Sequence, residues 1–80
     1  MPTVLREDGF EVMIYTDDHE PPHVHVFYGG GMVIINLRDF NTRKVKNLKI
    51  TDVKRARKIV ATHQEFLSNK WNEFHGRHNG

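Results

Sequence analysis

The chain has 80 residues, no cysteine and a formal net charge of +2, and 28% of its residues are charged. This length predicts one domain over residues 1–80 with a modest core, and the missing cysteine excludes disulfides and thiolate zinc sites. No segment has the roughly 20 apolar residues of a membrane helix or the pattern of a signal peptide, so we expect a cytoplasmic protein without membrane contact.

Apolar and polar residues alternate through the N-terminal half, which predicts strands and turns between residues 2 and 47. Asp8-Gly9 is a strong hairpin signal. The three glycines at 29–31 predict a second turn, because glycine reaches positive φ at no steric cost. Residues 17–22 form a predicted loop. The predicted strands are residues 2–6, 10–16, 23–28, 32–37 and 42–47.

A single long helix is predicted over residues 52–75, followed by a loose tail over residues 76–80. Thr51 is a suitable N-cap, and Asp52 suits the positive end of the helix dipole. No proline or glycine occurs between Thr51 and His75, and apolar residues recur at spacings of three and four. The predicted buried stripe consists of Val53, Ala56, Ile59, Val60, His63, Phe66, Leu67, Trp71 and Phe74.

These elements predict an α+β fold, with a mostly antiparallel sheet of four to five strands and one long C-terminal helix packed on one face. The fourth strand is apolar on both faces, so its second side needs cover from a loop, a ligand or the second copy of a homodimer. The fifth strand is basic, which favours an edge of the sheet. Alternation along the third strand places Val24 and Val26 towards the helix, and His23, His25 and Phe27 on the opposite face.

Two histidines lie on the third predicted strand, directly after a pair of prolines at positions 21 and 22. The prolines favour an extended lead-in, and the alternation of a strand then puts His23 and His25 side by side on one face. Histidine titrates near neutral pH, so one ring could act as a general base and the other as a general acid, with Glu20 as a further candidate catalytic group. The simpler interpretation is a polar strip on a half-exposed strand.

The same two histidines are candidate metal ligands, because neutral imidazole binds zinc and other divalent metals. Further ligands would come from the preceding loop, where the candidates are Asp17, Asp18, His19 and Glu20. The site that we expect combines His23 and His25 with Glu20 or His19.

Charge is distributed unevenly along the chain. Residues 1–37 carry one basic and six acidic side chains, a net of −5, whereas residues 38–58 carry nine basic and two acidic ones, a net of +7. The basic part predicts contact with the phosphates of RNA or DNA or with an acidic partner protein, the alternative being a solvated surface. Residues 43–49 include no aromatic that could stack on a base, so they do not by themselves predict single-strand recognition. The candidate nucleic-acid-binding residues are Arg43, Lys44, Lys46, Lys49, Lys54, Arg55 and Lys58.

Several of these motifs occur together in one known family. They are Met1-Pro2-Thr3-Val4-Leu5-Arg6, Asp8-Gly9-Phe10, His19-Glu20-Pro21-Pro22-His23-Val24-His25-Val26, the glycine-rich turn and Trp71-Asn72-Glu73-Phe74. The chain resembles the small bacterial proteins grouped as domain of unknown function 4160. The most specific motif is Glu-Pro-Pro-His-x-His, which Glu20 to His25 carry here.

The resemblance assigns no activity. Members are often encoded beside another small protein, similar to toxin–antitoxin pairs, which implies a small protein partner and a link to nucleic acid. The first hypothesis is therefore an interaction module of such a pair. The second is a metal-independent ribonuclease with His23 and His25 as acid and base, and cationic side chains stabilising phosphate charge. The third is a metal-binding domain built on the two histidines.

Overall fold

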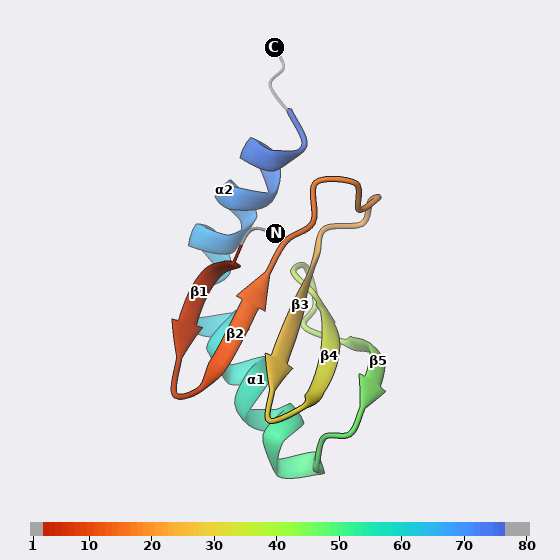
Figure 1. Ribbon diagram of the computed structural model, residues 1–80. Helices are drawn as coiled ribbons and strands as arrows, with labels where there is room; N and C mark the ends of the chain where they lie inside the picture. The colour runs from red at the N-terminus through yellow and green to blue at the C-terminus, as the bar shows by residue number, and fades with distance from the viewer. Residues whose placement is uncertain (1–2, 77–80) are drawn as a thin grey trace.

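The computed structural model describes residues 3–76, which form a five-stranded antiparallel sheet with two helices on one side (Figure 1). The strands are β1 (Thr3–Glu7), β2 (Phe10–Met13), β3 (His23–Tyr28), β4 (Gly31–Asn36) and β5 (Thr42–Lys46). They lie in the sheet in chain order, and each adjacent pair is antiparallel. The predicted α+β class is confirmed, and the basic fifth strand lies at an edge.

Two tight hairpins build most of the sheet. The central turn residues Asp8 and Gly9 have φ of 52° and 83°, and Gly29 and Gly30 have φ of 53° and 84°. Positive φ at both central residues is the mark of a type I′ turn, whose twist matches the twist of the flanking strands. Gly31, which the sequence placed in the turn, is instead the first residue of β4.

The prediction of one long helix is wrong, because two helices follow the sheet. They are α1 (Ile50–Thr62) and α2 (Gln64–Phe74). The N-cap of α1 is Lys49, which makes no side-chain capping bond, so Thr51 lies inside the first turn rather than at the cap. The residues of the predicted tail beyond Gly76 lie outside the described residues.

The helix is interrupted at His63, where φ is −108° and ψ is 24°. The imidazole Nε2 of His63 lies 2.9 Å from the carboxylate of Glu7 in β1. The side-chain amide of the next residue, Gln64, donates to the carbonyl oxygen of Leu37 at 2.7 Å. These contacts tie two successive residues at the junction of the helices to β1 and to the residue that follows β4.

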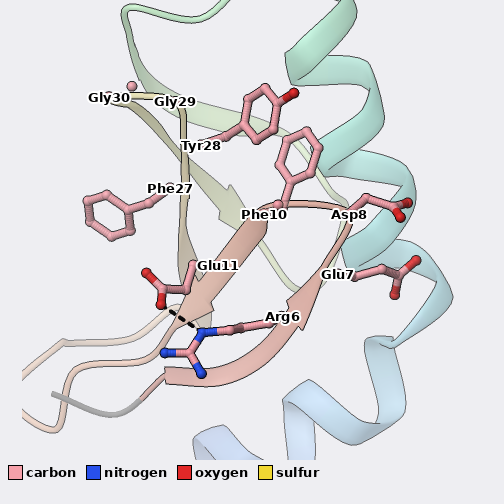
Figure 2. A pocket seen from close by; sticks show the side chains of 11 residues that line it. Arg6, Glu7, Asp8, Phe10, Glu11, Phe27, Tyr28, Gly29 and Gly30 are labelled. Carbon is pink, nitrogen blue, oxygen red and sulfur yellow. Dashed lines mark hydrogen bonds and ion pairs between the residues drawn. The ribbon is translucent and has the colours of Figure 1, made fainter.

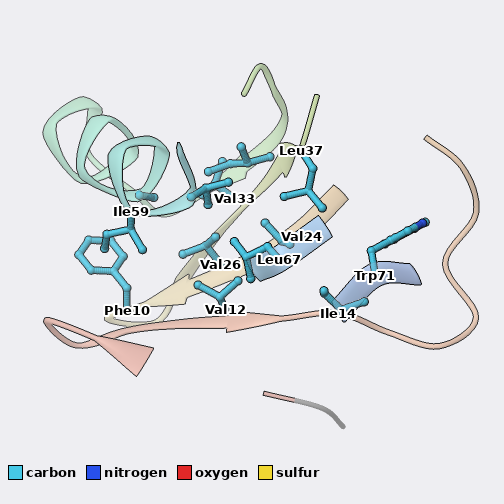
Figure 3. Packing of buried hydrophobic residues seen from close by; sticks show 13 residues of the cluster. Phe10, Val12, Ile14, Val24, Val26, Val33, Leu37, Ile59, Leu67 and Trp71 are labelled. Carbon is cyan, nitrogen blue, oxygen red and sulfur yellow. The ribbon is translucent and has the colours of Figure 1, made fainter. Parts of the chain in front are cut away.

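The core lies between the sheet and the helices (Figure 3). Val24 and Val26 are fully buried on the helix side of β3, as the alternation predicts. Leu67 and Trp71 of α2 pack into the same core, whereas Phe66 is 42% exposed, so its predicted burial is wrong. The core consists of Phe10, Val12, Ile14, Val24, Val26, Val33, Ile35, Leu37, Ala56, Ile59, Val60, Leu67 and Trp71.

The opposite side of the sheet carries no helix (Figure 1), and we call it the helix-free face. Residues that pair across adjacent strands point to the same side, so the register defines its members. They are Arg6, Glu11, Met13, His23, His25, Phe27, Met32, Ile34, Asn36, Lys44 and Lys46. Between residues 3 and 76, no helix is long and apolar enough to cross a membrane.

Candidate functional site

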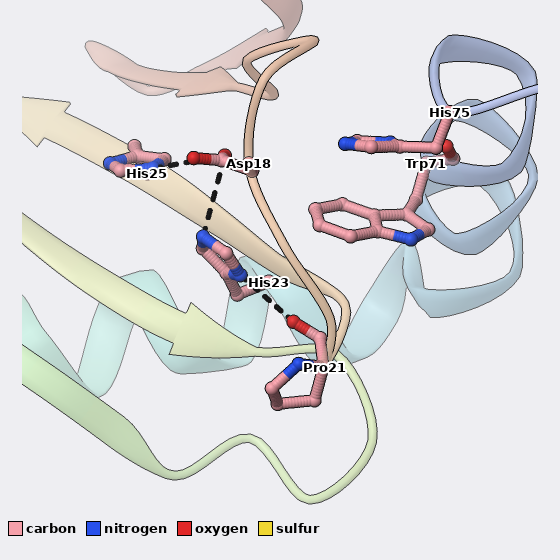
Figure 4. A network of polar contacts seen from close by, with 6 residues as sticks. All are labelled: Asp18, Pro21, His23, His25, Trp71 and His75. Carbon is pink, nitrogen blue, oxygen red and sulfur yellow. Dashed lines mark hydrogen bonds and ion pairs between the residues drawn. The ribbon is translucent and has the colours of Figure 1, made fainter.

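One carboxylate and two imidazoles converge where the 17–22 loop meets β3 (Figure 4). We call Asp18, His23 and His25 the Asp–His cluster. Each contributes a ligand atom, and the three atoms lie within 4.8 Å of one another. In the described part of the chain, this is the one group of three or more such side chains close enough to hold a metal ion.

His23 is held in a fixed orientation by the backbone of the loop. Its Nδ1–H donates to the carbonyl oxygen of Pro21 at 2.9 Å. Its Nε2 lies 3.3 Å from Oδ2 of Asp18, and only 6% of the His23 side chain is exposed. The loop is tied to the sheet in turn, because the carbonyl oxygen of Pro22 accepts a hydrogen bond from the amide of Leu37 at 3.0 Å.

His25 presents its own Nε2 to the same oxygen of Asp18, at 3.2 Å. Its side chain is 13% exposed and that of Asp18 is 17% exposed, so the cluster is reachable from solvent on this side. Burial lowers the pKa of His25, and the carboxylate of Asp18 opposes that shift only in part. We therefore expect His25 to be neutral near pH 7, which is the form that binds metals.

Aromatic rings support both imidazoles. The ring of Tyr15 meets His25 edge-on, with centroids 4.6 Å apart. The indole of Trp71 in α2 lies behind His23 at 5.3 Å, and His75 stacks on the other side of that indole at 3.8 Å. Because Trp71 also belongs to the core, the position of His23 is tied to the packing of α2 against the sheet.

When the ring of His23 is neutral, its hydrogen bond to Pro21 leaves an electrostatic conflict in the cluster. A neutral imidazole that donates from Nδ1 has a lone pair on Nε2. That lone pair then faces the carboxylate of Asp18, so two acceptors meet at 3.3 Å. The contact becomes favourable only when a second proton on His23 or a cation lies between them.

The fold brings only one of the candidate loop ligands to the two histidines. Asp18 joins the two histidines, whereas His19 and Glu20 are exposed and lie outside the cluster. Asp17 is exposed as well. Strand alternation places His23 and His25 correctly, but it says nothing about a loop. Asp18 reaches the histidines because of the path that the chain takes around the prolines. No rule of sequence spacing predicts that path.

The fold separates the predicted nucleic-acid-binding residues from one another. Lys44 and Lys46 lie on the helix-free face, opposite Ile34 and Met32 of β4. Arg43 lies at the register shift of β5, and Lys49 lies in the connection between β5 and α1. The others lie on the exposed side of α1 and are Lys54, Arg55 and Lys58.

Arg55 has a structural role that the sequence did not indicate. Its guanidinium lies 4.9 Å from the ring centroid of Phe10 and 5.4 Å from that of Tyr28, which stack on each other at 4.0 Å. Such cation–π contacts stabilise the fold by holding the cation over the aromatic faces. Arg55 is therefore less available to phosphate than the lysines around it.

An open depression of about 640 Å³ lies at the hairpin end of the sheet (Figure 2). It is lined by Arg6, Glu7, Asp8, Gly9, Phe10, Glu11, Phe27, Tyr28, Gly29, Gly30 and Gly31. The side chain of Phe27 points away from those of Phe10 and Tyr28 in this view. No member of the Asp–His cluster lines the depression, so the depression and the cluster are separate features.

The fold and the cluster define a small α+β domain with one carboxylate and two imidazoles at a loop–strand junction. Residues 9–72 match the family described as Domain of unknown function (DUF4160), so the chain belongs to that family. No curated protein and no solved structure matches the chain. The family describes no activity, and the chemistry of the site therefore has to indicate the function.

Proposed function

We propose that the chain is a divalent-metal-binding domain whose ligands are Asp18, His23 and His25. The observation that carries the proposal is the shared contact of the two Nε2 atoms with Oδ2 of Asp18, at 3.2 and 3.3 Å. A metal ion among these atoms would accept the lone pair of His23, which otherwise faces a carboxylate oxygen.

The two distances between Asp18 and the imidazole nitrogens fit a tetrahedral ion. Zinc bonds to imidazole nitrogen and carboxylate oxygen are about 2.0–2.1 Å long, so neighbouring ligand atoms in a tetrahedron are roughly 3.3–3.4 Å apart. The two distances from Asp18 are 3.2 and 3.3 Å. The third pair, the two imidazole nitrogens, lies within 4.8 Å, so the rings would move together where they are farther apart than a tetrahedron allows.

The surroundings also resemble those of a metal ligand. A metal-bound histidine usually donates its other N–H to a carbonyl or carboxylate, which fixes the tautomer. His23 does so to Pro21. Three protein ligands leave a fourth position for water or a substrate, as in catalytic rather than structural zinc sites. Nitrogen and oxygen donors without thiolate suit zinc, and two histidines with one carboxylate also suit iron(II).

The alternative of a metal-independent ribonuclease is less well supported. An acid–base pair needs two imidazoles that reach the substrate. Both nitrogens of His23 are engaged, with Pro21 and with Asp18, and its side chain is 6% exposed. Glu20, the further catalytic candidate, lies outside the cluster.

The role in a toxin–antitoxin-like pair, the small partner protein and the cytoplasmic location remain predictions. They come from the resemblance to the family and from the composition. No contact among residues 3–76 bears on them, and a co-purification experiment with the neighbouring gene product would test the partner.

Native mass spectrometry and zinc titration of the untagged protein test the proposal. We expect one zinc ion per chain in the wild type. In Asp18→Asn, which keeps the shape of the side chain, we expect zinc affinity at least about 100-fold weaker, because even the loss of a group that only hydrogen-bonds to a metal ligand costs about 10–100-fold. X-ray absorption of the zinc complex should show two imidazole ligands.

Two neighbouring residues provide matched controls. Asp17→Asn and His19→Ala change an exposed carboxylate and an exposed imidazole of the same loop, and both should bind zinc like the wild type. Circular dichroism in a chelator checks that each variant is folded. Equal zinc affinity in Asp18→Asn and the wild type would refute the site, and loss of binding in His19→Ala would show that the ligands are different.

A further inference from the structure

Away from the Asp–His cluster, the helix-free face carries a group of apolar side chains that no helix covers. Phe27, Met32, Ile34 and Met13 on this face are only partly buried. Within residues 3–76, none of the four belongs to the hydrophobic core or packs against it. Contiguous apolar side chains that remain partly exposed on a folded domain are typical of a surface that binds a partner or ligand.

An aromatic ring and a cation lie in one row across this face. Phe27 of β3 pairs with Met32 of β4, and Met32 pairs with Lys46 of β5. Two strand spacings of roughly 4.8 Å therefore separate Phe27 from Lys46, which is about 10 Å. The sequence offered no aromatic residue next to the lysines, and the cross-strand register supplies one.

The next row connects this surface with the Asp–His cluster. His25 pairs with Ile34, and Ile34 pairs with Lys44. Lys44 and Lys46 are alternate residues of one strand, so their positions repeat at roughly 6.5–7 Å along the edge of the face.

We propose that the helix-free face binds single-stranded nucleic acid, with a base stacked on Phe27 and backbone phosphates held by Lys44 and Lys46. Proteins that bind single strands combine a cationic track with aromatic platforms, because every base has a π-face. Both lysines are exposed, so they can reach phosphates without loss of a structural contact. The inference does not depend on the metal, since Phe27 and the lysines lie outside the cluster.

Charge favours a polyanion over a second copy of the chain on this face. Glu11 is the one acidic member of the helix-free face, and the guanidinium of Arg6 already pairs with it at 2.9 Å. In a face-to-face dimer, the lysines of each copy would therefore meet no free carboxylate from the sheet of the other. A nucleic-acid strand offers a phosphate at every nucleotide.

Fluorescence anisotropy with labelled 12-nucleotide oligonucleotides in a chelator tests the proposal without interference from metal. The probes are oligouridine RNA, oligothymidine DNA and a duplex of the same length, each titrated at several salt concentrations. We expect binding of one or both single strands and much weaker binding of the duplex. The two single-strand arms show whether RNA or DNA is preferred.

Two pairs of variants locate the binding surface. The double variant Lys44→Gln/Lys46→Gln should reduce the slope of log K against log salt by about 1.4, because each single-strand phosphate contact contributes about 0.7. The control Lys54→Gln/Lys58→Gln removes the same charge from exposed positions of α1 and should leave the slope unchanged.

The aromatic contribution is tested by Phe27→Leu, with Phe66→Leu on the exposed side of α2 as its control. Loss of the stacked ring should weaken single-strand binding at least about fivefold. Equal losses in the two lysine variants, or equal binding of duplex and single strand, would overturn the proposal. A dimer that dissociates in Phe27→Leu, without oligonucleotide binding by the wild type, would assign the face to a second copy.

Discussion

The substitution Gly31→Ala tests how closely β4 and β5 approach each other. A Cβ atom at position 31 would clash with the carbonyl oxygen of Asn47 and would lie 2.6 Å from that of Lys46. Both atoms belong to the backbone, so no side-chain rotation relieves the contact. Overpacking typically costs about 1–3 kcal/mol, and we expect about 3 kcal/mol here because the end of β5 has to move.

That cost is large for a domain of this size. At about 0.05–0.15 kcal/mol per residue, a chain of this length has a total stability of roughly 4–12 kcal/mol. A loss of about 3 kcal/mol lowers the melting temperature by roughly 12–24 °C. Gly30→Ala is the control, since Gly30 has φ of 84° and open space around it, and strain alone should cost about 1 kcal/mol. Equal melting temperatures of the two variants would refute the close approach of β5.

Two further predictions concern the core and the pH dependence of folding. Leu67→Ala should cost about 2–5 kcal/mol in urea unfolding, because Leu67 is fully buried, whereas Phe66→Ala at the adjacent exposed position should cost about 0.5 kcal/mol or less. Similar costs would contradict the assigned orientation of α2. In a chelator, the lowered pKa of His25 means that, as the pH falls, the unfolded chain takes up a proton before the folded chain does. The contribution of His25 to the free energy of unfolding is therefore fully present above pH 6.5 and is lost as the pH falls below that value. Urea midpoints at pH 7.5 and 5.5 should differ less in His25→Gln than in the wild type, and an equal difference would exclude this origin.

Strand alternation was sufficient to predict much of the fold. The turn signals at Asp8-Gly9 and at the glycines placed the hairpins, and the period of two put His23, His25 and Phe27 on the face away from the helices. These features depend on neighbours in sequence or on one strand, and local rules describe them well.

The helix break required information that a local rule does not contain. His63 leaves the helix where its ring meets Glu7, a residue 56 positions earlier in the chain. The wrong burial of Phe66 has a different origin, because Val60, Leu67 and Trp71 keep the helical spacing across the break and Phe66 lies at the margin of this stripe. Asp18 illustrates the same limit at the site, since the path of its loop depends on the contact between Pro22 and Leu37.

His25 links the two proposed surfaces, because it contacts Asp18 in the cluster and pairs with Ile34 on the helix-free face. A metal ion at the cluster would add positive charge at the end of a face that already carries Lys44 and Lys46. It would therefore attract a polyanion laid along that face, and zinc and nucleic acid would strengthen each other's binding. A chelator removes the metal and leaves the face unchanged, so each proposal can fail without the other. Zinc bound without oligonucleotide affinity would retain the cluster alone, and oligonucleotide bound in chelator without zinc affinity would retain the face alone.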